Sequence, residues 1–568
     1  MAPFNYMRRQ PMRFAAYLLL VPLAALCEVA LSWVLQIITD VVTGKQHLPY
    51  LWLSVGILLY LLGKSATYFA QSFQRSRLLA QGSRLLRDDL YAATSQRSFA
   101  QFGSQNHGFY LAKFNKEVEI IENNYYGTSL RAYYLAWQLL IALAGTIFIS
   151  PWVTLAIILL CIPSMAMPFL SQKQSEHAQT QVVAATTHYN DRVDDFINGF
   201  STLRLNATGS RFGDLFAQAA DRLAQKEIHN QLVIKLVGQF LNLFNDLQYV
   251  GTWLLGGFLV LRGTITLGQP VAFSQLMVFI SNPLFQAADL LSTFYGGRAV
   301  VQKVQKYLDR TTVSTPKAKL HPAIHTIQFH DVGLHVDDTP LLQHIDLLLQ
   351  TSRKYIIVGQ SGSGKSTLVR QLFGYYAAAS GTITIDGYNI HDLAFADIAD
   401  HLTYVDQTTY LFNATLQDNV TVFHDVPETQ TRTALTEAGL QKLLTADSAG
   451  LHRQLSNRST AISGGERQRL ALARNRLRQP LFTIYDELTS GLDPAIAATI
   501  ENTLFAAAGG LVFITHRFNQ PIFEKADEII VIDQGRILSR GPYTDNTVRH
   551  ALDGLGLVPA ATTVDDHS

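Results

Sequence analysis

The sequence has 568 residues, of which 48% are hydrophobic and only 16% charged. This length favours more than one domain, and the low charge content is atypical of a fully soluble protein, so we expect part of the chain to lie in lipid. The formal net charge of +1 gives no reason to expect a nucleic acid or an acidic partner. The two cysteines, Cys27 and Cys161, lie in apolar runs without paired spacing, which argues against a disulfide framework or a zinc site.

Six stretches in the first 300 residues are poor in charge, and each approximates the roughly 20 residues that a helix needs to cross a bilayer. They are residues 14–38, 51–70, 133–149, 152–170, 236–261 and 265–290. Buried soluble helices are the alternative, but so many successive runs favour membrane helices. The first run is longer than a signal-peptide core and lacks a clear cleavage site, so it is interpreted as a retained anchor.

Basic residues predict the orientation of these helices. They flank the first, second and fourth stretches on one side: Arg8, Arg9, Arg13, Arg75, Arg77, Arg84, Arg87 and Lys173. Since basic loops face the cytoplasm, the polar insertions at residues 71–131 and 171–235 are expected there. Helical spacing of their apolar residues predicts that the membrane helices continue as long cytoplasmic stalks.

The composition and residue pattern of the sequence change after residue 306. Residues 309–322 are polar and contain two prolines, and from about residue 325 β-branched runs alternate with helical patterns. The predicted fold is multidomain. It comprises an all-α six-helix transmembrane domain at residues 1–305 with long cytoplasmic extensions, a linker at 306–322, an α/β P-loop nucleotide-binding domain at 323–555 and a disordered tail at 556–568.

A glycine-rich loop follows the strand-like run at residues 355–358 and precedes an apolar helix. It consists of Gly359, Gln360, Ser361, Gly362, Ser363, Gly364, Lys365, Ser366 and Thr367, and it matches G-x-x-x-x-G-K-[ST]. Its backbone N–H groups are expected to wrap phosphates, Lys365 to neutralise their charge, and Ser366 to ligate Mg²⁺. The predicted ligands are therefore ATP and Mg²⁺.

Two acids end a second strand-like run, residues 481–485. Asp486 is predicted to hold Mg²⁺ directly or through water, and Glu487 to polarise the attacking water. An acidic strand end by itself is more often a cap or a turn. Its position downstream of the glycine-rich loop favours the catalytic interpretation.

Residues 462–468 read Ile-Ser-Gly-Gly-Glu-Arg-Gln and precede a helical stretch. With the loop and the acids, this segment makes the chain resemble the ATP-binding cassette (ABC) transporter family over nearly its whole length. The closest pattern is the exporter-type half-transporter, whose signature is usually LSGGQ. The resemblance implies that Ser463, Gly464, Gly465 and Glu466 close over ATP held by a second subunit, so that hydrolysis requires a dimer.

The resemblance implies further roles. Gln407 looks like the glutamine that contacts Mg²⁺ and the transport domain, His516 like the switch histidine at the γ-phosphate, and residues 490–493 like the D-loop. Residues 108–113 and 196–200 resemble the coupling helices that dock on nucleotide-binding domains. Val336 stands where the family places an aromatic residue against adenine. Either His335 or apolar contact from Val336 takes over that contact.

The predicted function is transport driven by ATP hydrolysis of a peptide, drug, lipid or other amphiphile across the cytoplasmic membrane, most simply export by alternating access. Because every catalytic motif is present, a homodimer is favoured over a heterodimer. An importer of similar architecture and a non-transporting regulatory membrane ATPase are the alternatives. Polar residues in the apolar stretches are candidate cavity residues, with hydrogen bonding between helices, or a position in a cytoplasmic extension outside lipid, as the other interpretation: Glu28, Lys64, Asn242, Asn245, Asp246, Gln275, Asn282, Gln286 and Asp289.

Overall fold

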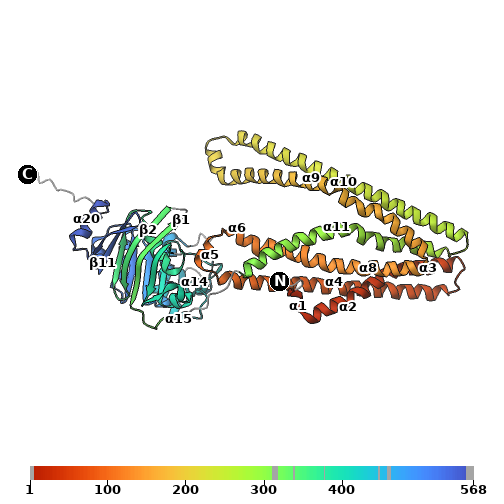
Figure 1. Ribbon diagram of the computed structural model, residues 1–568. Coiled ribbons are helices and arrows are strands. Elements are labelled where there is room, and N and C mark those ends of the chain that lie inside the picture. Colours follow the sequence, from red (N-terminus) through yellow and green to blue (C-terminus); the bar gives the residue numbers. More distant parts are fainter. Residues whose placement is uncertain are drawn as a thin grey trace, which may run out of the picture. The chain divides into compact units, whose positions relative to one another are not determined.

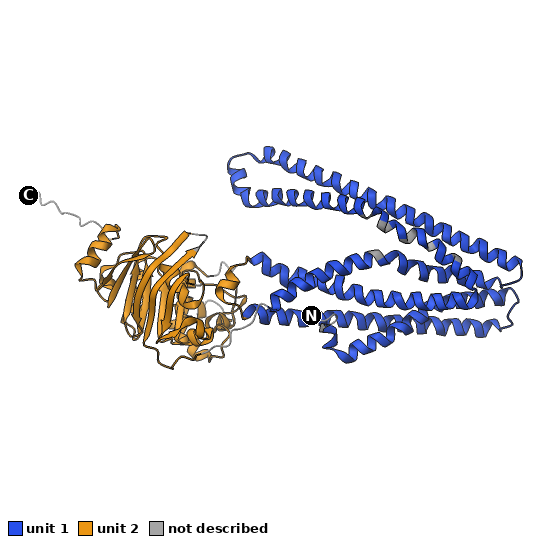
Figure 2. Cartoon of the chain, in the orientation of Figure 1, with its two compact units in different colours: residues 1–95, 107–311 blue, residues 96–106, 312–568 orange. Residues whose placement is uncertain are grey.

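The computed structural model describes residues 5–309, 318–336, 339–376, 378–445, 448–456, 462–490 and 492–557. The chain divides into two compact units, which are coloured separately in Figure 2. Unit 1 contains residues 1–95 and 107–311, and unit 2 contains residues 96–106 and 312–568. A short segment from the first half of the chain thus belongs to the second unit. Most of the predicted tail, from residue 558 onward, and residues 310–317 of the predicted linker lie outside the described residues.

All the regular secondary structure in the described part of unit 1 is helical. Its elements are α1 (Asn5–Arg8), α2 (Pro11–Val29), α3 (Leu31–Val42), α4 (Tyr50–Ser95), α6 (His107–Leu111), η1 (Ala112–Glu117), α7 (Val118–Ile120), η2 (Ile121–Gly127), α8 (Thr128–Ile149), α9 (Pro151–Leu205), α10 (Gly209–Leu261) and α11 (Gly268–Asp309). Two of them, η1 and η2, are π-helical turns within one long helical path.

Local sequence explains several helix boundaries. Pro11 and Pro151 occupy first-turn positions of α2 and α9, where the missing N–H costs no hydrogen bond. Between α9 and α10 the chain reverses over a few residues that include Ala207 at φ +56°. The two helices then pack along one another as a long hairpin (Figure 1).

The first predicted apolar stretch spans α2 and α3, and each of the other five falls mainly or wholly within one helix. By length and composition, three described helical segments are able to cross a membrane: residues 11–42, 50–95 and 107–149. The bent pair Gly268–Ala287 and Asp289–Asp309 makes a fourth if it counts as one span. Crossings at 152–170 and 236–261, within α9 and α10, stay predictions. The lengths of α4, α9, α10 and α11, at 46, 55, 53 and 42 residues, exceed the roughly 20 that a bilayer requires.

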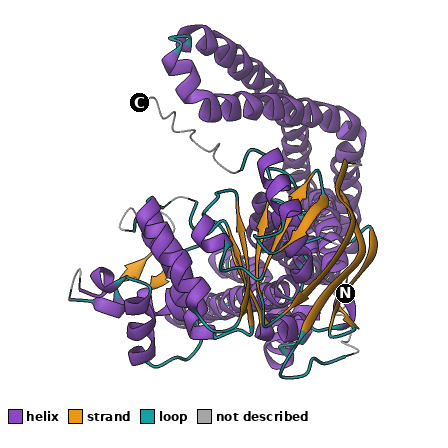
Figure 3. Ribbon diagram, turned by 90° about the vertical axis from the view of Figure 1, so that its left-hand side faces the viewer, coloured by secondary structure: helices purple, strands orange, loops and turns teal. Residues whose placement is uncertain are grey.

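Unit 2 contains two main sheets (Figure 3). Six strands form a sheet in the order β12-β11-β3-β10-β9-β6, in which only β12 runs antiparallel to its neighbour. An antiparallel sheet has the order β2-β1-β4-β5. The strands are β1 (Thr326–Val336), β2 (Thr339–Gln350), β3 (Lys354–Val358), β4 (Ser380–Ile385), β5 (Tyr388–Asn389), β6 (Leu402–Val405), β7 (Ala414–Thr415), β8 (Gln454–Leu455), β9 (Phe482–Asp486), β10 (Gly510–Thr515), β11 (Glu528–Asp533) and β12 (Arg536–Gly541).

Helices cover these sheets and build a separate helical layer. The elements are α5 (Phe99–Gly103), α12 (Lys365–Arg370), η3 (Gln371–Phe373), η4 (Ile390–Asp392), α13 (Phe395–His401), α14 (Leu416–Thr421), α15 (Glu428–Glu437), α16 (Gln441–Thr445), η5 (Gly450–His452), α17 (Gly464–Arg478), α18 (Pro494–Ala506), α19 (Gln520–Phe523) and α20 (Asn546–Gly554). The helical layer has its own core around Leu416, Leu435 and Leu470.

The central strands are apolar on both faces because helices or a second sheet cover each side. Ile357, Ile484 and Ile514 pack in the core shared with the antiparallel sheet, whereas Ile356 and Phe513 pack on the other side. The predicted fold class, helical transmembrane domain followed by an α/β nucleotide-binding domain, is confirmed. One parallel arrangement matters for function: β6, β9, β10 and β3 all end at the same edge of their sheet.

Candidate functional site

The glycine-rich loop connects β3 to α12, as the sequence predicts. Gly362 and Gly364 adopt φ of +83° and +98°, a backbone region that side chains disfavour. At Gly359, a Cβ atom would lie 2.0 Å from the carbonyl oxygen of Ile532, so only glycine fits. These positions let the loop turn tightly between the strand and the N-terminus of α12, which is the geometry of a phosphate cradle.

Lys365 is 5% exposed and folds back over this loop. Its Nζ donates to the carbonyl oxygens of Gly359, at 3.0 Å, and Gln360, at 2.7 Å. Burial lowers the pKa of Lys365, and the nearby charges of Glu487 and Asp486 oppose that shift. The ammonium group therefore lies inside the loop beside both predicted acids.

Asp486 ends β9 and is 2% exposed. Ser366 Oγ donates to its Oδ1 at 2.9 Å, and the Tyr404 hydroxyl donates to its Oδ2. Ser366 and Asp486 thus lie together, as predicted for two ligands of one cation. A hydroxyl and a carboxylate are hard oxygen ligands of the kind that Mg²⁺ prefers, so these residues fit that ion.

Glu487 follows Asp486 and has a left-handed backbone conformation, with φ +48°. Its carboxylate meets two other predicted site residues. Gln407 Nε2 donates to Glu487 Oε2 at 2.9 Å, and His516 Nδ1 lies 3.4 Å from Glu487 Oε1. Gln407 follows β6 and His516 follows β10, the strands on either side of β9. The shared carboxyl edge of these parallel strands therefore brings the three residues together.

The predicted signature segment forms the N-terminus of α17. Ser463 is the N-cap and makes a reciprocal capping box with Glu466. The Ser463 backbone N–H donates to Glu466 Oε2 at 2.9 Å, and this hydrogen bond is the main reason that the pKa of Glu466 lies below its usual value. Among the described residues, no hydrogen bond or ion pair joins residues 463–466 to the glycine-rich loop or to the acids.

Two other expectations lie partly outside the described residues. His335 is exposed in β1, opposite Pro340, but the Val336 side chain is not described, so the adenine contact stays open. Gly491 of the predicted D-loop also lies outside the described residues. Asp493 of the same segment caps α18 by accepting a hydrogen bond from the backbone N–H of Ala495 at 2.9 Å.

Residues 108–113, the first predicted docking segment, belong to unit 1, and their docking role stays a prediction. The neighbouring segment α5 belongs to unit 2 and packs within it. The Phe99 ring stacks on Tyr375 at 4.2 Å between centroids and meets Phe395 edge-on at 5.3 Å. The backbone N–H of Ala100 donates to the carbonyl of Gly374 at 3.2 Å.

Within unit 1, Lys113 of the first predicted docking segment is buried. It is 1% exposed and its Nζ lies 3.0 Å from Glu117 Oε2. The second predicted docking segment, residues 196–200, lies at the distal end of α9, where Phe196, Ile197 and Phe200 are exposed. Its docking role stays a prediction.

Two residues of the site were missed by sequence reasoning. Arg370, the last residue of α12, donates through Nε to the Tyr404 hydroxyl at 2.8 Å and lies 3.7 Å from Asp486 Oδ2. Tyr404 lies in β6 and binds Asp486 directly. No local motif marks either residue, since each acts on a side chain more than 80 residues away in the sequence.

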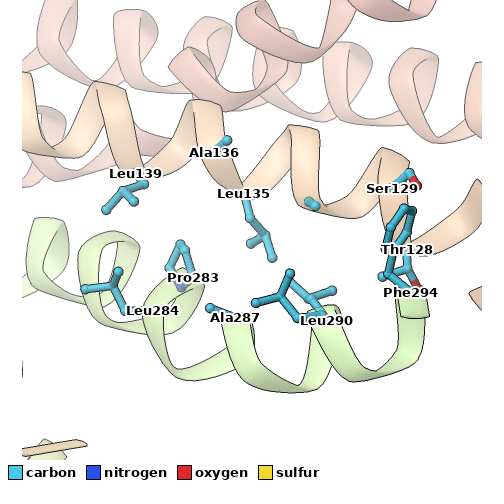
Figure 4. A pocket seen from close by; sticks show the side chains of 12 residues that line it. Thr128, Ser129, Leu135, Ala136, Leu139, Pro283, Leu284, Ala287, Leu290 and Phe294 are labelled. Atoms are coloured by element: carbon cyan, nitrogen blue, oxygen red, sulfur yellow. The ribbon is translucent and has the colours of Figure 1, made fainter. Parts of the chain in front are cut away.

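Unit 1 contains a mostly apolar cavity of about 420 Å³ between α8 and α11 (Figure 4). Its lining comprises Thr128, Ser129, Ala132, Leu135, Ala136, Leu139, Pro283, Leu284, Ala287, Leu290, Leu291 and Phe294. Arg131 Nη2 donates to Gln286 Oε1 at 2.5 Å and so joins the same two helices.

Glu28 links α2 to α8, because its Oε2 accepts hydrogen bonds from the Tyr134 hydroxyl and, at 2.7 Å, from Gln138 Nε2. Glu28 and Gln286 therefore take part in hydrogen bonding between helices, the alternative to a free cavity position.

Comparison with known proteins agrees with both units. The family described as "ABC transporter transmembrane region" matches residues 14–284, and that described as "ABC transporter" matches residues 342–490. A bacterial Atm1-family ABC exporter solved with ATP bound has a TM-score of 0.75 and 21% identity, over 97% of this chain and 99% of that one. This similarity supports the fold.

Several curated relatives share about a quarter of their residues with the chain. An ATP-dependent lipid A-core flippase of Syntrophus aciditrophicus is 25% identical, over 94% of this chain and 89% of the relative. A fatty acid ABC transporter ATP-binding/permease protein of Mycobacterium bovis is 25% identical, over 82% and 74%. A lactococcin-A transport/processing protein of Lactococcus lactis is 25% identical, over 87% and 69%. With its transmembrane and ATP-binding parts fused in one chain, the protein belongs to the ABC transporter family and is an ATPase coupled to transport across a membrane.

Proposed function

We propose that the chain is one half of a dimeric exporter that uses ATP hydrolysis to move an amphiphile out of the cytoplasm. The observation that carries this proposal is the meeting of Gln407, Glu487 and His516 beside the Ser366–Asp486 pair. This cluster combines a carboxylate able to accept a proton, two groups able to orient it, and oxygen ligands for a cation.

In the proposed reaction, the loop from Gly359 to Thr367 holds the phosphates and Lys365 leaves its two carbonyl partners to neutralise them. Ser366 and Asp486, with Gln407, would hold Mg²⁺, which when bound would neutralise phosphate charge. Glu487 accepts hydrogen bonding from the attacking water and takes its proton as the water oxygen bonds to the γ-phosphorus and the bond to ADP breaks. His516 donates to the γ-phosphate.

The signature supports the dimer. Residues 463–466 form a helix N-terminus, and among the described residues no hydrogen bond or ion pair joins it to the chain's own glycine-rich loop. Its anion-binding face is therefore available to ATP on a second copy. Since this chain carries every predicted catalytic residue, two identical halves make two complete sites. A homodimer is therefore proposed, with the nucleotide-binding unit in the cytoplasm.

The substrate class rests on the transmembrane unit. The cavity between α8 and α11 has an apolar lining with hydroxyls at one end, which suits an amphiphile. The names of the relatives include a lipid A-core flippase and a fatty acid transporter, both of which are named for amphiphiles. Export rather than import is proposed because the fold resembles that of an exporter.

The test uses the full chain reconstituted in lipid vesicles. ATPase activity is measured with a panel of lipids, fatty acids, peptides and drugs, and transport is measured in vesicles with ATP outside. Glu487→Gln is expected to lower the ATPase rate by about 10²- to 10⁴-fold, as for loss of a general base. Glu524→Gln, at a surface glutamate of the same unit, is the matched control. Full activity in Glu487→Gln would refute the assigned base, and ATP-driven uptake of no member of the panel would refute the proposed substrate class.

A further inference from the structure

A continuous set of contacts within unit 2 leads from α5 to Asp486. It begins where Phe99 stacks on Tyr375, with ring planes inclined by only 8°. In the sequence α5 lies between α4 and α6, two helices of unit 1. A displacement of either helix is therefore passed to Phe99 through the backbone.

Arg370 is the next group in this set. Its guanidinium lies over the rings of Tyr375, at 5.8 Å, and Tyr404, at 5.5 Å. Cations at such distances from an aromatic face are attracted by the ring. The same guanidinium donates to the Tyr404 hydroxyl at 2.8 Å and to Asp406 Oδ1 at 3.1 Å. The planar group is therefore held from several directions at once.

Tyr404 passes this arrangement on to Asp486. Its hydroxyl accepts from Arg370 and donates to Asp486 Oδ2, while Ser366 occupies Oδ1. Both oxygens of the acid are thus oriented, one by the glycine-rich loop and the other by Tyr404.

Asp406 connects the same set to the second acid. It precedes Gln407, whose side chain donates to Glu487. Arg370 therefore contacts Tyr404, which orients Asp486, and also Asp406. Asp406 is adjacent in sequence to Gln407, the hydrogen-bond partner of Glu487.

We propose that Arg370 and Tyr404 are positioning residues that transmit the stacking of Phe99 on Tyr375 to Asp486. The affinity of the site for its divalent cation therefore depends on α5. The inference rests on the proposed role of Asp486 as a cation ligand. It goes further in assigning a route through side chains that no motif contains.

The test measures binding of Mn²⁺ by electron paramagnetic resonance in the full chain, with a non-hydrolysable ATP analogue present. Tyr404→Phe removes only the hydroxyl and is expected to weaken Mn²⁺ binding by about 3- to 10-fold, the value of one hydrogen bond. Tyr388→Phe, the same change at an exposed tyrosine of unit 2, is expected to bind Mn²⁺ like the unchanged protein.

Phe99→Ala is expected to weaken Mn²⁺ binding in the same direction, although none of the ring contacts of Phe99 among the described residues involves a predicted site residue. Phe99→Tyr, which keeps the stacked ring, is expected to restore it. The two residues act along one route. The double variant Phe99→Ala/Tyr404→Phe is therefore expected to bind Mn²⁺ no more weakly than whichever single variant has the lower Mn²⁺ affinity. The thermal midpoint without nucleotide is measured for every variant to show that each is folded.

Unchanged Mn²⁺ binding in Tyr404→Phe or in Phe99→Ala overturns the proposal, as does a double variant whose loss is the product of the single losses. Arg370→Lys tests the same connection, since it keeps the charge but not the simultaneous contacts, and it is expected to weaken Mn²⁺ binding as Tyr404→Phe does. Asp486→Asn separates the two levels of inference. Wild-type Mn²⁺ binding in Asp486→Asn refutes the cation-ligand role itself, whereas loss there with no effect of Tyr404→Phe refutes only the transmission route.

Discussion

Gln407 Nε2 donates a hydrogen bond of 2.9 Å to Glu487 Oε2, across 80 residues of sequence. The contact exists because β6 pairs with β9 in parallel, with Val405 opposite Tyr485, so that the residues just beyond these two strands meet. It joins Gln407, which is predicted to contact the transport domain, to the acid proposed as the base.

Replacing Gln407 by Leu is expected to lower the ATPase rate about tenfold to a hundredfold. The substitution removes a donor to a charged group, an interaction that is worth about 1.5–3 kcal/mol. The measurement is the steady-state rate at saturating ATP with Mg²⁺ varied. Gln417→Leu, in α14 of the same unit, serves as the comparison. A Gln407→Leu rate within twofold of the unchanged protein would show that Glu487 needs no orientation by this amide.

Replacing Lys365 by Ala is expected to abolish stabilisation by ATP. Ligand that binds only the folded protein raises its stability by about 2.7 kcal/mol at a concentration 100 times Kd, so loss of affinity removes the shift. The thermal midpoint is measured with and without ATP. Lys442→Ala, at an exposed lysine of α16, is expected to keep the full shift. An ATP-dependent shift of normal size in Lys365→Ala would contradict the phosphate-binding role.

The Ser463–Glu466 capping box predicts an acid-dependent stability. Because the pKa of Glu466 is lowered in the folded chain, its carboxylate adds stability above its ordinary pKa and loses that contribution as the pH falls through the folded value. Glu466→Gln is therefore expected to lose less stability than the unchanged protein below about pH 4.3. Thermal midpoints across that range test this, and parallel curves for the two proteins would contradict it.

Lys113 and Lys303 offer a matched pair in unit 1, since both bind Glu117 but differ in exposure, at 1% and 63% of the side chain. Lys113→Met removes a buried partner that also lies 4.4 Å from the Tyr307 ring, and is expected to cost about 3 kcal/mol. Lys303→Met is expected to cost at most about 1 kcal/mol. Thermal unfolding of the two variants in the same lipid measures the difference. Equal losses would show that burial does not govern this ion pair.

The sequence by itself determined the nature of the protein because its strongest signals are local. A phosphate-binding loop needs glycines, a lysine and a hydroxyl at fixed positions within one short segment, so residues 359–367 predict it without knowledge of the fold. Membrane helices need uninterrupted apolar runs, and the capping pattern at Ser463 and Glu466 lies within four residues. The family and the fusion of a membrane part with an ATP-binding part were predictable on this basis.

Only the tertiary structure decided which side chains meet across long stretches of sequence. Nothing near Tyr404 indicates that its hydroxyl holds Asp486, because that contact follows from the order of the parallel strands. The same holds for α5: no local pattern indicates that Phe99 stacks on Tyr375, because that contact depends on how distant parts of unit 2 pack. Local patterns specify elements and motifs, but long-range packing chooses the partners of each side chain.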